Sequence, residues 1–372
     1  MSFKEIFCQD WAIDILQRAF LAGRWAHSYI FAGPEGVGKF KTAREWAKLL
    51  GCNEPVTENG LAESCGSCDS CRLFEAGSSP DFHHVYKELL QFTKGNADKK
   101  TPRDLSIDVI RELLIAKASA RPTVSQRKVF VVSEAEKLNN ASQNALLKVL
   151  EEPPEYCCIV LLCTRLEKLL PTTKSRCQTI QFAPIDESRI IDKLKEMGLG
   201  QEPARYFARL AQGSLGTACR WAELELAEAN LYQAKRELLA ALAGYGLAEA
   251  LSLAEKFVAE SKRIATAWAG IDKDTSKTDI NRRASATLLR MIILALHDVM
   301  MLGVKGAEVT SGWDQRGVME KLAGRFDVEQ AAEKISECYR MLNWIESNVN
   351  EKLIFERLLL SLADSDTMPS YR

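Results

Sequence analysis

The sequence predicts an α/β domain with a parallel sheet, followed by a long run of helices. Two observations indicate this fold class. Short, almost wholly apolar segments alternate with helical patterns up to residue 182, and strand patterns then stop. Strands that are apolar throughout are typical of a parallel sheet covered by helices on both faces. A glycine-rich loop between the first such strand and the next helix, "GPEGVGK", favours the same architecture.

The elements of the first half follow in order. A helical pattern over residues 9–24 precedes the strand "SYIFAG" and the helix "KTAREWAKLLG". "PDFHHVY" predicts a second strand, and "SIDVIRELLIAKASARP" predicts a helix with Ser106 as its N-cap. The strands "VFVV" and "CCIVLLCT" flank the helix "NNASQNALLKVLEEPP", which two prolines terminate. "SRCQTIQFAP" contains the last predicted strand.

The helical remainder divides into two parts. Residues 1–183 form the predicted α/β domain, residues 184–226 a small helical domain and residues 227–372 a larger helical domain. The charged segment "GIDKDTSKTDINRR", around Lys273, is predicted to be a loop within the third domain.

Composition excludes several classes of protein. The 372 residues are 47% hydrophobic and carry a formal net charge of −1, which is typical of a globular protein with no overall attraction to nucleic acid or anionic membrane. No window approaches the roughly 18 uninterrupted apolar residues of a membrane helix. Acidic residues at positions 10 and 14 break the apolar pattern that a secretory leader needs. We therefore expect a cytoplasmic protein that does not contact membranes.

The glycine-rich loop has the spacing of a phosphate-binding loop, with Gly33, Gly36, Gly38 and Lys39 in the required places. Backbone N–H groups in such a loop point at phosphates, helped by the positive end of the following helix. The next residue should be Ser or Thr, whose hydroxyl holds magnesium. It is Phe40, which cannot ligate a metal. Metal-assisted phosphoryl transfer is therefore predicted to be badly weakened.

The second position expected to contact magnesium is also altered. In nucleotide hydrolases with this loop, a buried strand ends in an Asp that contacts magnesium, followed by a Glu that orients the attacking water. Here the strand "VFVV" runs into Ser133 and Glu134. Both protein contributions to the metal site are altered together, which favours a chain that no longer hydrolyses ATP.

Four cysteines form the most specific metal pattern. Cys52, Cys65, Cys68 and Cys71 are spaced C-x12-C-x2-C-x2-C. Four thiolates match a closed, structural zinc site. An iron–sulfur cluster also uses four cysteines, and a set of free thiols is the third alternative.

Taken together, these features resemble the bacterial clamp-loader subunits of DNA polymerase III, members of the AAA+ class. The resemblance rests on "AHSYIFAGPEGVGK", the four cysteines, "SIDVIREL", "NALLKVLEEPP", "LLCTRLEKLLPTTKSRC" and "NVNEKLIFERLLL". It implies a RecA-like AAA+ P-loop domain with a zinc module at residues 52–71, a helical lid domain, and a helical collar domain for oligomerisation. It also implies DNA replication as the process, within the DNA-directed DNA polymerase III holoenzyme.

Within that family the chain resembles the delta-prime class. A hydrolysing gamma/tau subunit should have Ser or Thr at position 40, Asp at 133, and Arg in a G-S-x-R motif where this chain has Gly216. The resemblance implies that Arg176, supported by Ser175 and Cys177, acts as an arginine finger on a neighbouring subunit's ATP. Thr164 occupies the family's first sensor position. ATP binding by the chain itself stays open.

The implied partners are the gamma/tau and delta subunits, and through the complex the sliding clamp and primed DNA. Two alternatives remain. One is an ATP-hydrolysing gamma/tau-type subunit that tolerates Phe40. The other is a stand-alone, zinc-dependent nucleic-acid-binding protein, which the near-neutral charge disfavours.

Overall fold

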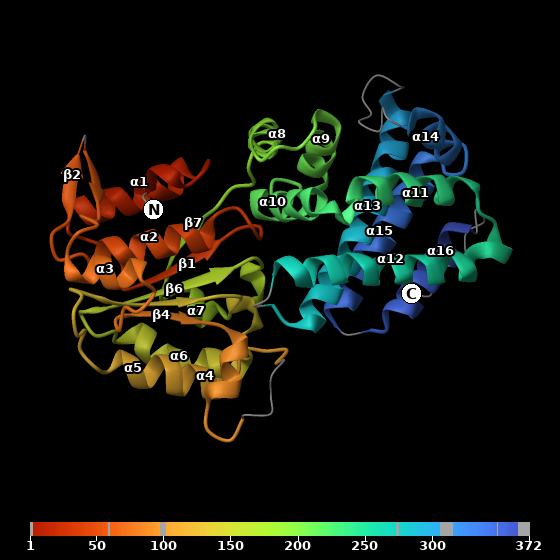
Figure 1. Cartoon of the computed structure of the whole chain (residues 1–372). Helices are drawn as coiled ribbons and strands as arrows, with labels where there is room; N and C mark the ends of the chain where they lie inside the picture. Colours follow the sequence, from red (N-terminus) through yellow and green to blue (C-terminus); the bar gives the residue numbers. More distant parts are fainter. Residues whose placement is uncertain are drawn as a thin grey trace. The chain divides into compact units, whose positions relative to one another are not determined.

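The chain divides into two compact units. A computed structural model describes residues 3–58, 60–96, 102–272, 275–305, 315–347 and 349–363 (Figure 1). One unit comprises Met1–Asp186 with Gly213–Thr217, and the other comprises Glu187–Gln212 with Ala218–Arg372. The finer division into three domains stays a prediction.

The first unit is built on a parallel sheet of five strands in the order β4-β5-β6-β1-β7. The strands are β1 (Ser28–Ala32), β4 (Phe82–Val85), β5 (Lys128–Val132), β6 (Cys157–Cys163) and β7 (Gln178–Gln181). β1 lies inside the sheet, where Ile30 pairs with Leu161 of β6 and with Thr179 of β7. Each strand predicted from the sequence is present, and the predicted α/β class with a parallel sheet is confirmed.

Helices cover both faces of this sheet (Figure 1). Successive side chains of a strand point to opposite faces, so Tyr29 and Phe31 pack on one side and Ile30 and Ala32 on the other. The first face is covered by α1 (Asp10–Leu21) and α2 (Lys39–Gly51), and the second by α4 (Ile107–Val109), η3 (Ile110–Ile115) and α6 (Asn140–Glu151). Burial of both faces explains why the strands are apolar throughout.

The remaining elements of this unit are short. They are η1 (Phe3–Glu5), α3 (Asp69–Glu75), η2 (Lys87–Phe92), α5 (Ala116–Ala118), η4 (Ala135–Lys137), η5 (Leu166–Lys168) and α7 (Pro171–Lys174). The helix predicted from Ser106 is continuous through α4, η3 and α5, but η3 is a π-helix. Ser106 is its N-cap, as predicted, because its side chain accepts a hydrogen bond from the N–H of Val109.

A small hairpin lies within the cysteine segment and was not predicted. It consists of β2 (Val56–Glu58) and β3 (Leu61–Glu63). The buried amide of Gln17 donates to the carbonyl of Ala62 (2.9 Å) and accepts from its N–H (2.7 Å), which fastens the hairpin to α1. Strands of three residues are too short to give a periodic pattern in the sequence.

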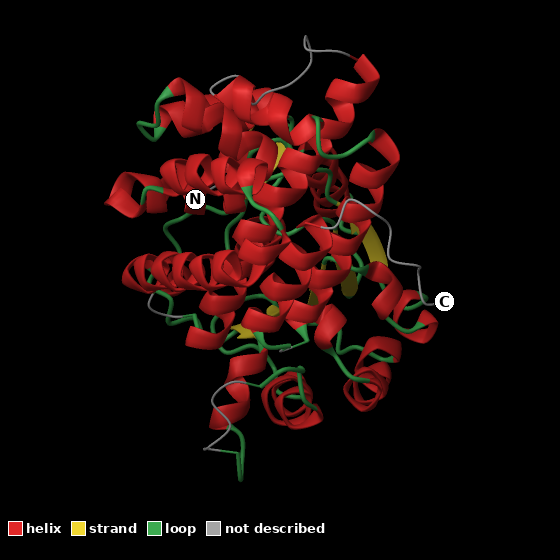
Figure 2. Ribbon diagram, turned by 90° about the vertical axis from the view of Figure 1, so that its right-hand side faces the viewer, coloured by secondary structure: helices red, strands yellow, loops and turns green. Residues whose placement is uncertain are grey.

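In its described part the second unit contains only helices, which Figure 2 draws in red. They are α8 (Glu187–Glu196), α9 (Gln201–Leu210), α10 (Leu215–Leu224, whose first three residues belong to the first unit), η6 (Glu225–Ala229), α11 (Leu231–Gly244), η7 (Leu247–Glu249), α12 (Ala250–Ile271), α13 (Lys277–Lys305), α14 (Arg316–Ala323), α15 (Val328–Glu346) and α16 (Glu351–Ala363). The long helix α13 packs against α12, α14 and α15. Arg209 of α9 pairs with the buried Asp298 of α13 at 2.7 Å.

One expectation for this unit needs correction. The predicted loop "GIDKDTSKTDINRR" is helical from Lys277 onward, because Ser276 caps α13: its hydroxyl accepts the N–H of Asp279 (3.2 Å) and donates to the Asp279 carboxylate (2.9 Å). Lys273 itself lies outside the described residues.

The helix α13 bears on the prediction that no uninterrupted apolar run of membrane length occurs, and it does not contradict that prediction because Arg290 and Asp298 interrupt its apolar sequence. Among the described residues, the stretch Lys277–Val304 is long and apolar enough to cross a membrane by length and composition alone. More than half of its most apolar window is buried inside the protein, as in a core helix of a folded domain.

Candidate functional site

The phosphate-type loop joins the end of β1 to the start of α2. Gly33, Gly36 and Gly38 have φ values of +155°, +74° and +106°, and Gly38 immediately precedes the first helical residue, Lys39. A Cβ atom at Gly33 would lie 2.3 Å from the carbonyl oxygen of Phe182. The loop conformation therefore requires glycine at positions where the spacing predicted it.

Lys39 is turned onto the loop itself. Only 8% of the residue is exposed, and its ammonium group donates to the carbonyl oxygens of Gly33 and Pro34. Burial lowers the pKa of Lys39, and the nearby carboxylate of Glu136 opposes that shift. The cation that would contact nucleotide phosphates is thus engaged with the backbone in this structure.

The two positions expected to hold magnesium are linked through a histidine. The Phe40 ring packs on the His84 ring with centroids 4.6 Å apart, and His84 Nε2 lies 2.8 Å from the hydroxyl of Ser133. The Tyr86 ring also packs on His84, with ring centroids 4.8 Å apart. Burial lowers the pKa of His84 to about 4, so the imidazole is neutral at physiological pH. An aromatic and hydroxyl cluster thus lies at the two positions where magnesium contacts were expected.

The predicted acidic residue Glu134 is committed to neighbouring lysines. Its backbone has a left-handed conformation (φ +53°), and its carboxylate pairs with Lys137 and lies 3.5 Å from Lys87. The charge of a carboxylate held between two ammonium groups is largely compensated. The Glu134 carboxylate is thus engaged by two lysines in this structure.

A different carboxylate, Glu136, contacts Thr164, the residue at the predicted sensor position. The hydroxyl of Thr164, which closes β6, donates to the Glu136 carboxylate, and the Thr164 N–H does so at 3.3 Å. Sequence reasoning missed Glu136, because the contact joins residues 28 positions apart and no spacing rule signals it.

The segment Gly213–Thr217 packs on the phosphate-type loop. The N–H of Gly216 donates to the carbonyl of Gly36 at 2.8 Å. A Cβ at Gly216 would lie 2.9 Å from the Cα of Gly36, and one at Gly36 would lie 2.4 Å from the hydroxyl oxygen of Ser214. The glycine found where hydrolysing relatives are expected to have arginine therefore permits a close backbone contact.

Arg176 follows the short helix α7. Its guanidinium pairs with Glu151 and donates to the carbonyl of Thr172 at 2.9 Å. The hydroxyl of Ser175 lies 3.4 Å from the same guanidinium nitrogen, and Cys177 packs against the second face of the sheet. About a third of the Arg176 side chain is exposed. The triplet thus holds the arginine close to the protein surface.

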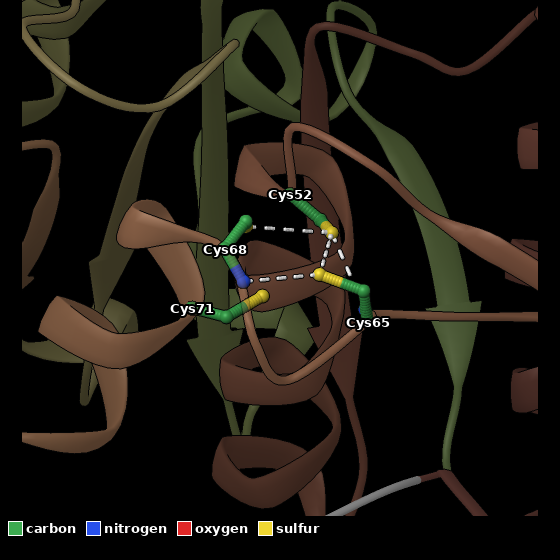
Figure 3. A group of neighbouring side chains, drawn as sticks. All are labelled: Cys52, Cys65, Cys68 and Cys71. Carbon is green, nitrogen blue, oxygen red and sulfur yellow. Dashed lines mark hydrogen bonds between the residues drawn. The ribbon is translucent and has the colours of Figure 1, made fainter.

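The four cysteines converge on one point (Figure 3). Cys52 follows α2, Cys71 lies on α3, and their sulfur atoms and those of Cys65 and Cys68 all lie within 4.8 Å of one another. The sulfurs of Cys52 and Cys65 are 3.6 Å apart, close to the roughly 3.8 Å expected between thiolates on a tetrahedral zinc ion. These four residues therefore fit a structural metal ion, which would cross-link the segment.

Backbone N–H groups favour the ionised form of one of the four thiols. N–H groups of Cys68 and Ser67 lower the pKa of the Cys65 thiol to about 6, whereas burial raises the pKa values of Cys52 and Cys71. A divalent cation would offset the cost of ionising the two buried thiols.

The comparisons agree with this geometry. The profile of the family described as "DNA polymerase III, delta subunit" matches residues 8–186. The delta' subunit of DNA polymerase III from Bacillus subtilis is 32% identical over 211 residues, covering 56% of this chain and 58% of the relative. The tau/gamma subunit from Haemophilus influenzae is 33% identical over 221 residues, covering 58% of this chain and 29% of the relative.

Two solved structures from Thermotoga maritima also align with this chain. A DNA polymerase III gamma subunit-related protein aligns over 95% of this chain and 98% of its own at 20% identity, with a TM-score of 0.43. The RuvB Holliday junction branch migration motor aligns over 59% of this chain and 62% of its own at 16% identity, with a TM-score of 0.37. The chain spans between 29% and 58% of the length of the two curated relatives described above.

Proposed function

Residues 8–186 place the chain in the family of DNA polymerase III clamp-loader subunits, and from this premise we propose that it is a delta-prime-type subunit that does not hydrolyse ATP. In this role the chain helps a complex load the sliding clamp onto primed DNA. Its partners are gamma/tau-type and delta-type subunits, and it acts in the cytoplasm.

One observation supports the non-hydrolysing role most directly. Phe40 and Ser133, which stand where two magnesium contacts are expected, both contact the neutral His84. A phenyl ring offers magnesium no ligand, and the Ser133 hydroxyl, which lies 2.8 Å from His84, stands in place of the expected carboxylate, so both protein contacts that organise phosphoryl transfer are altered. The hydrogen bonds from Lys39 to the carbonyls of Gly33 and Pro34 are consistent with a loop that has a structural role and no catalytic one.

The complementary part of the proposal concerns Arg176. A guanidinium supplied by one subunit can stabilise charge on the phosphate that another subunit transfers, which makes hydrolysis depend on assembly. Partial exposure of Arg176 beside the end of α7 supports a role in trans. The four cysteines would hold zinc, whose contribution is to stabilise the segment between α2 and α3.

A hydrolysing gamma/tau-type subunit is the second candidate, because relatives of both classes match at similar identity. The two functions differ in what the isolated chain does. A delta-prime-type subunit has no magnesium-dependent ATP turnover alone, whereas a gamma/tau-type subunit turns over ATP without help.

The test combines the isolated chain with a reconstituted complex. We expect no magnesium-dependent ATP turnover by the purified chain, and full turnover when gamma/tau-type and delta-type subunits are added. Arg176→Ala should leave the isolated fold intact and lower the ATPase rate of the complex by about tenfold or more. Clear magnesium-dependent ATP turnover by the chain alone would overturn the non-hydrolysing role. An unchanged ATPase rate of the complex with Arg176→Ala would refute the role of Arg176 as an arginine finger.

A further inference from the structure

We infer that Glu151 is a positioning residue for Arg176, an inference that rests on the proposed role of Arg176 as a finger in trans. The carboxylate of Glu151, at the end of α6, pairs with one terminal nitrogen of the Arg176 guanidinium. The two residues belong to different elements, so the pair fixes the arginine relative to the sheet-covering helix.

The guanidinium is held from two sides. One terminal nitrogen faces Glu151, and the other donates to the carbonyl of Thr172 at 2.9 Å. The third nitrogen, Nε, is buried and has no hydrogen-bond partner among the described residues. With one end buried and two nitrogens anchored, the side chain has a defined direction, and the exposed third of its surface is presented to solvent.

The position of the Glu151 carboxylate follows from the end of its helix. Glu151 is the last residue of α6, and Glu152 leaves the helical conformation (φ −126°, ψ 66°) before two prolines. A carboxylate at the negative end of a helix is unfavourable by itself, and a cation beside it offsets this. The helix end therefore favours an arginine at this place.

This arrangement matters more for orientation than for stability. Side chains of Glu151 and Arg176 are 47% and 32% exposed, and exposed ion pairs contribute little to folding. An arginine finger, in contrast, acts only when its guanidinium is already aimed at the phosphate, because reorganisation during the reaction removes the benefit. Loss of one anchor frees the long arginine side chain to adopt other rotamers.

The test uses the reconstituted complex with five variants of this chain: Glu151→Gln, Glu151→Asp, Glu152→Gln, Arg176→Ala and the double variant of Glu151→Gln with Arg176→Ala. Glu152 is a matched control, because it is the adjacent, exposed carboxylate and does not contact Arg176 in the described structure. Steady-state ATPase measurements give kcat and KM separately for each complex.

We expect Glu151→Gln to lower kcat by about three- to tenfold with KM for ATP unchanged, as for an interaction used in the transition state. Glu151→Asp should recover part of the rate, because it keeps the charge. Glu152→Gln should behave as wild type. The double variant should be no slower than Arg176→Ala, because Glu151 acts only through the arginine.

Three results would contradict the inference in distinguishable ways. If Arg176→Ala lowers kcat but Glu151→Gln does not, Glu151 has no positioning role and the finger stands. If the effects of Glu151→Gln and Arg176→Ala multiply in the double variant, Glu151 acts on the complex independently of Arg176. Unchanged kcat in Arg176→Ala would refute the proposed finger itself, and the inference with it.

Discussion

The close contact between Gly216 and the phosphate-type loop can be tested by adding one carbon atom. In Gly216→Ala the new Cβ would lie 2.9 Å from the Cα of Gly36 and 3.2 Å from its carbonyl oxygen. Non-bonded carbon atoms prefer separations of about 3.5–4.0 Å. The segment Gly213–Thr217 must therefore move away from the loop by several tenths of an ångström or more.

The free-energy cost has three parts. Overpacking of this kind costs about 1–3 kcal/mol. Weakening the 2.8 Å hydrogen bond from Gly216 to Gly36 costs about 1 kcal/mol. Alanine in α10 regains about 1 kcal/mol of helix propensity, which opposes these two costs. The contact should therefore be destabilised by about 1–3 kcal/mol in total.

Hydrogen–deuterium exchange measures this contact directly. A loss of 1–3 kcal/mol should speed exchange of the amides in residues 213–217 by about 5- to 150-fold. Gly270→Ala is the control, since a Cβ there meets nothing within 4 Å in the described structure, and it should leave these amides unchanged. Equal exchange at residues 213–217 in wild type and Gly216→Ala would refute the packing argument.

The remaining predictions concern the cysteine centre and the buried histidines. Metal analysis should find about one zinc per chain, Cys71→Ser should lose it and Cys177→Ser should keep it; folded wild-type protein that takes up no zinc would contradict the four-thiolate site. Burial lowers the pKa values of His83 and His84 to about 4, below the ordinary 6.5, so the unfolded chain binds these protons first. The free energy of unfolding should therefore be undiminished by these groups above about pH 6.5 and fall by about 1.4 kcal/mol per pH unit for each histidine as the pH drops toward 4. Urea unfolding at pH 7, 6 and 5 measures how the free energy of unfolding changes with pH. A free energy of unfolding that does not change over this range would show that burial lowers neither histidine pKa.

Much of the first unit was predictable because its patterns are local. Each strand has apolar residues throughout, and the loop glycines stand at fixed spacing. Ser106 marks the start of its helix, because its side chain accepts a hydrogen bond from the N–H of Val109, three residues further on. The cysteine cluster was equally predictable, since two C-x2-C steps place Cys65, Cys68 and Cys71 close together in the sequence.

Contacts between distant segments were not predictable in the same way. The pairing of Glu136 with Thr164 and the backbone contact of Gly216 with Gly36 depend on how whole elements meet. The start of α13 was missed for another reason: the charged residues after Ser276 suggested a loop, and the reciprocal cap between Ser276 and Asp279 outweighs that composition.

The bond between Gln17 and the hairpin has a consequence for solubility. A strand at the margin of a small sheet normally leaves backbone groups open to pairing with another molecule, a route to aggregation. At Ala62 both backbone groups are taken by one buried amide, which imitates a neighbouring strand. The helix α1 thereby hinders pairing of a strand from another molecule with this edge of the hairpin.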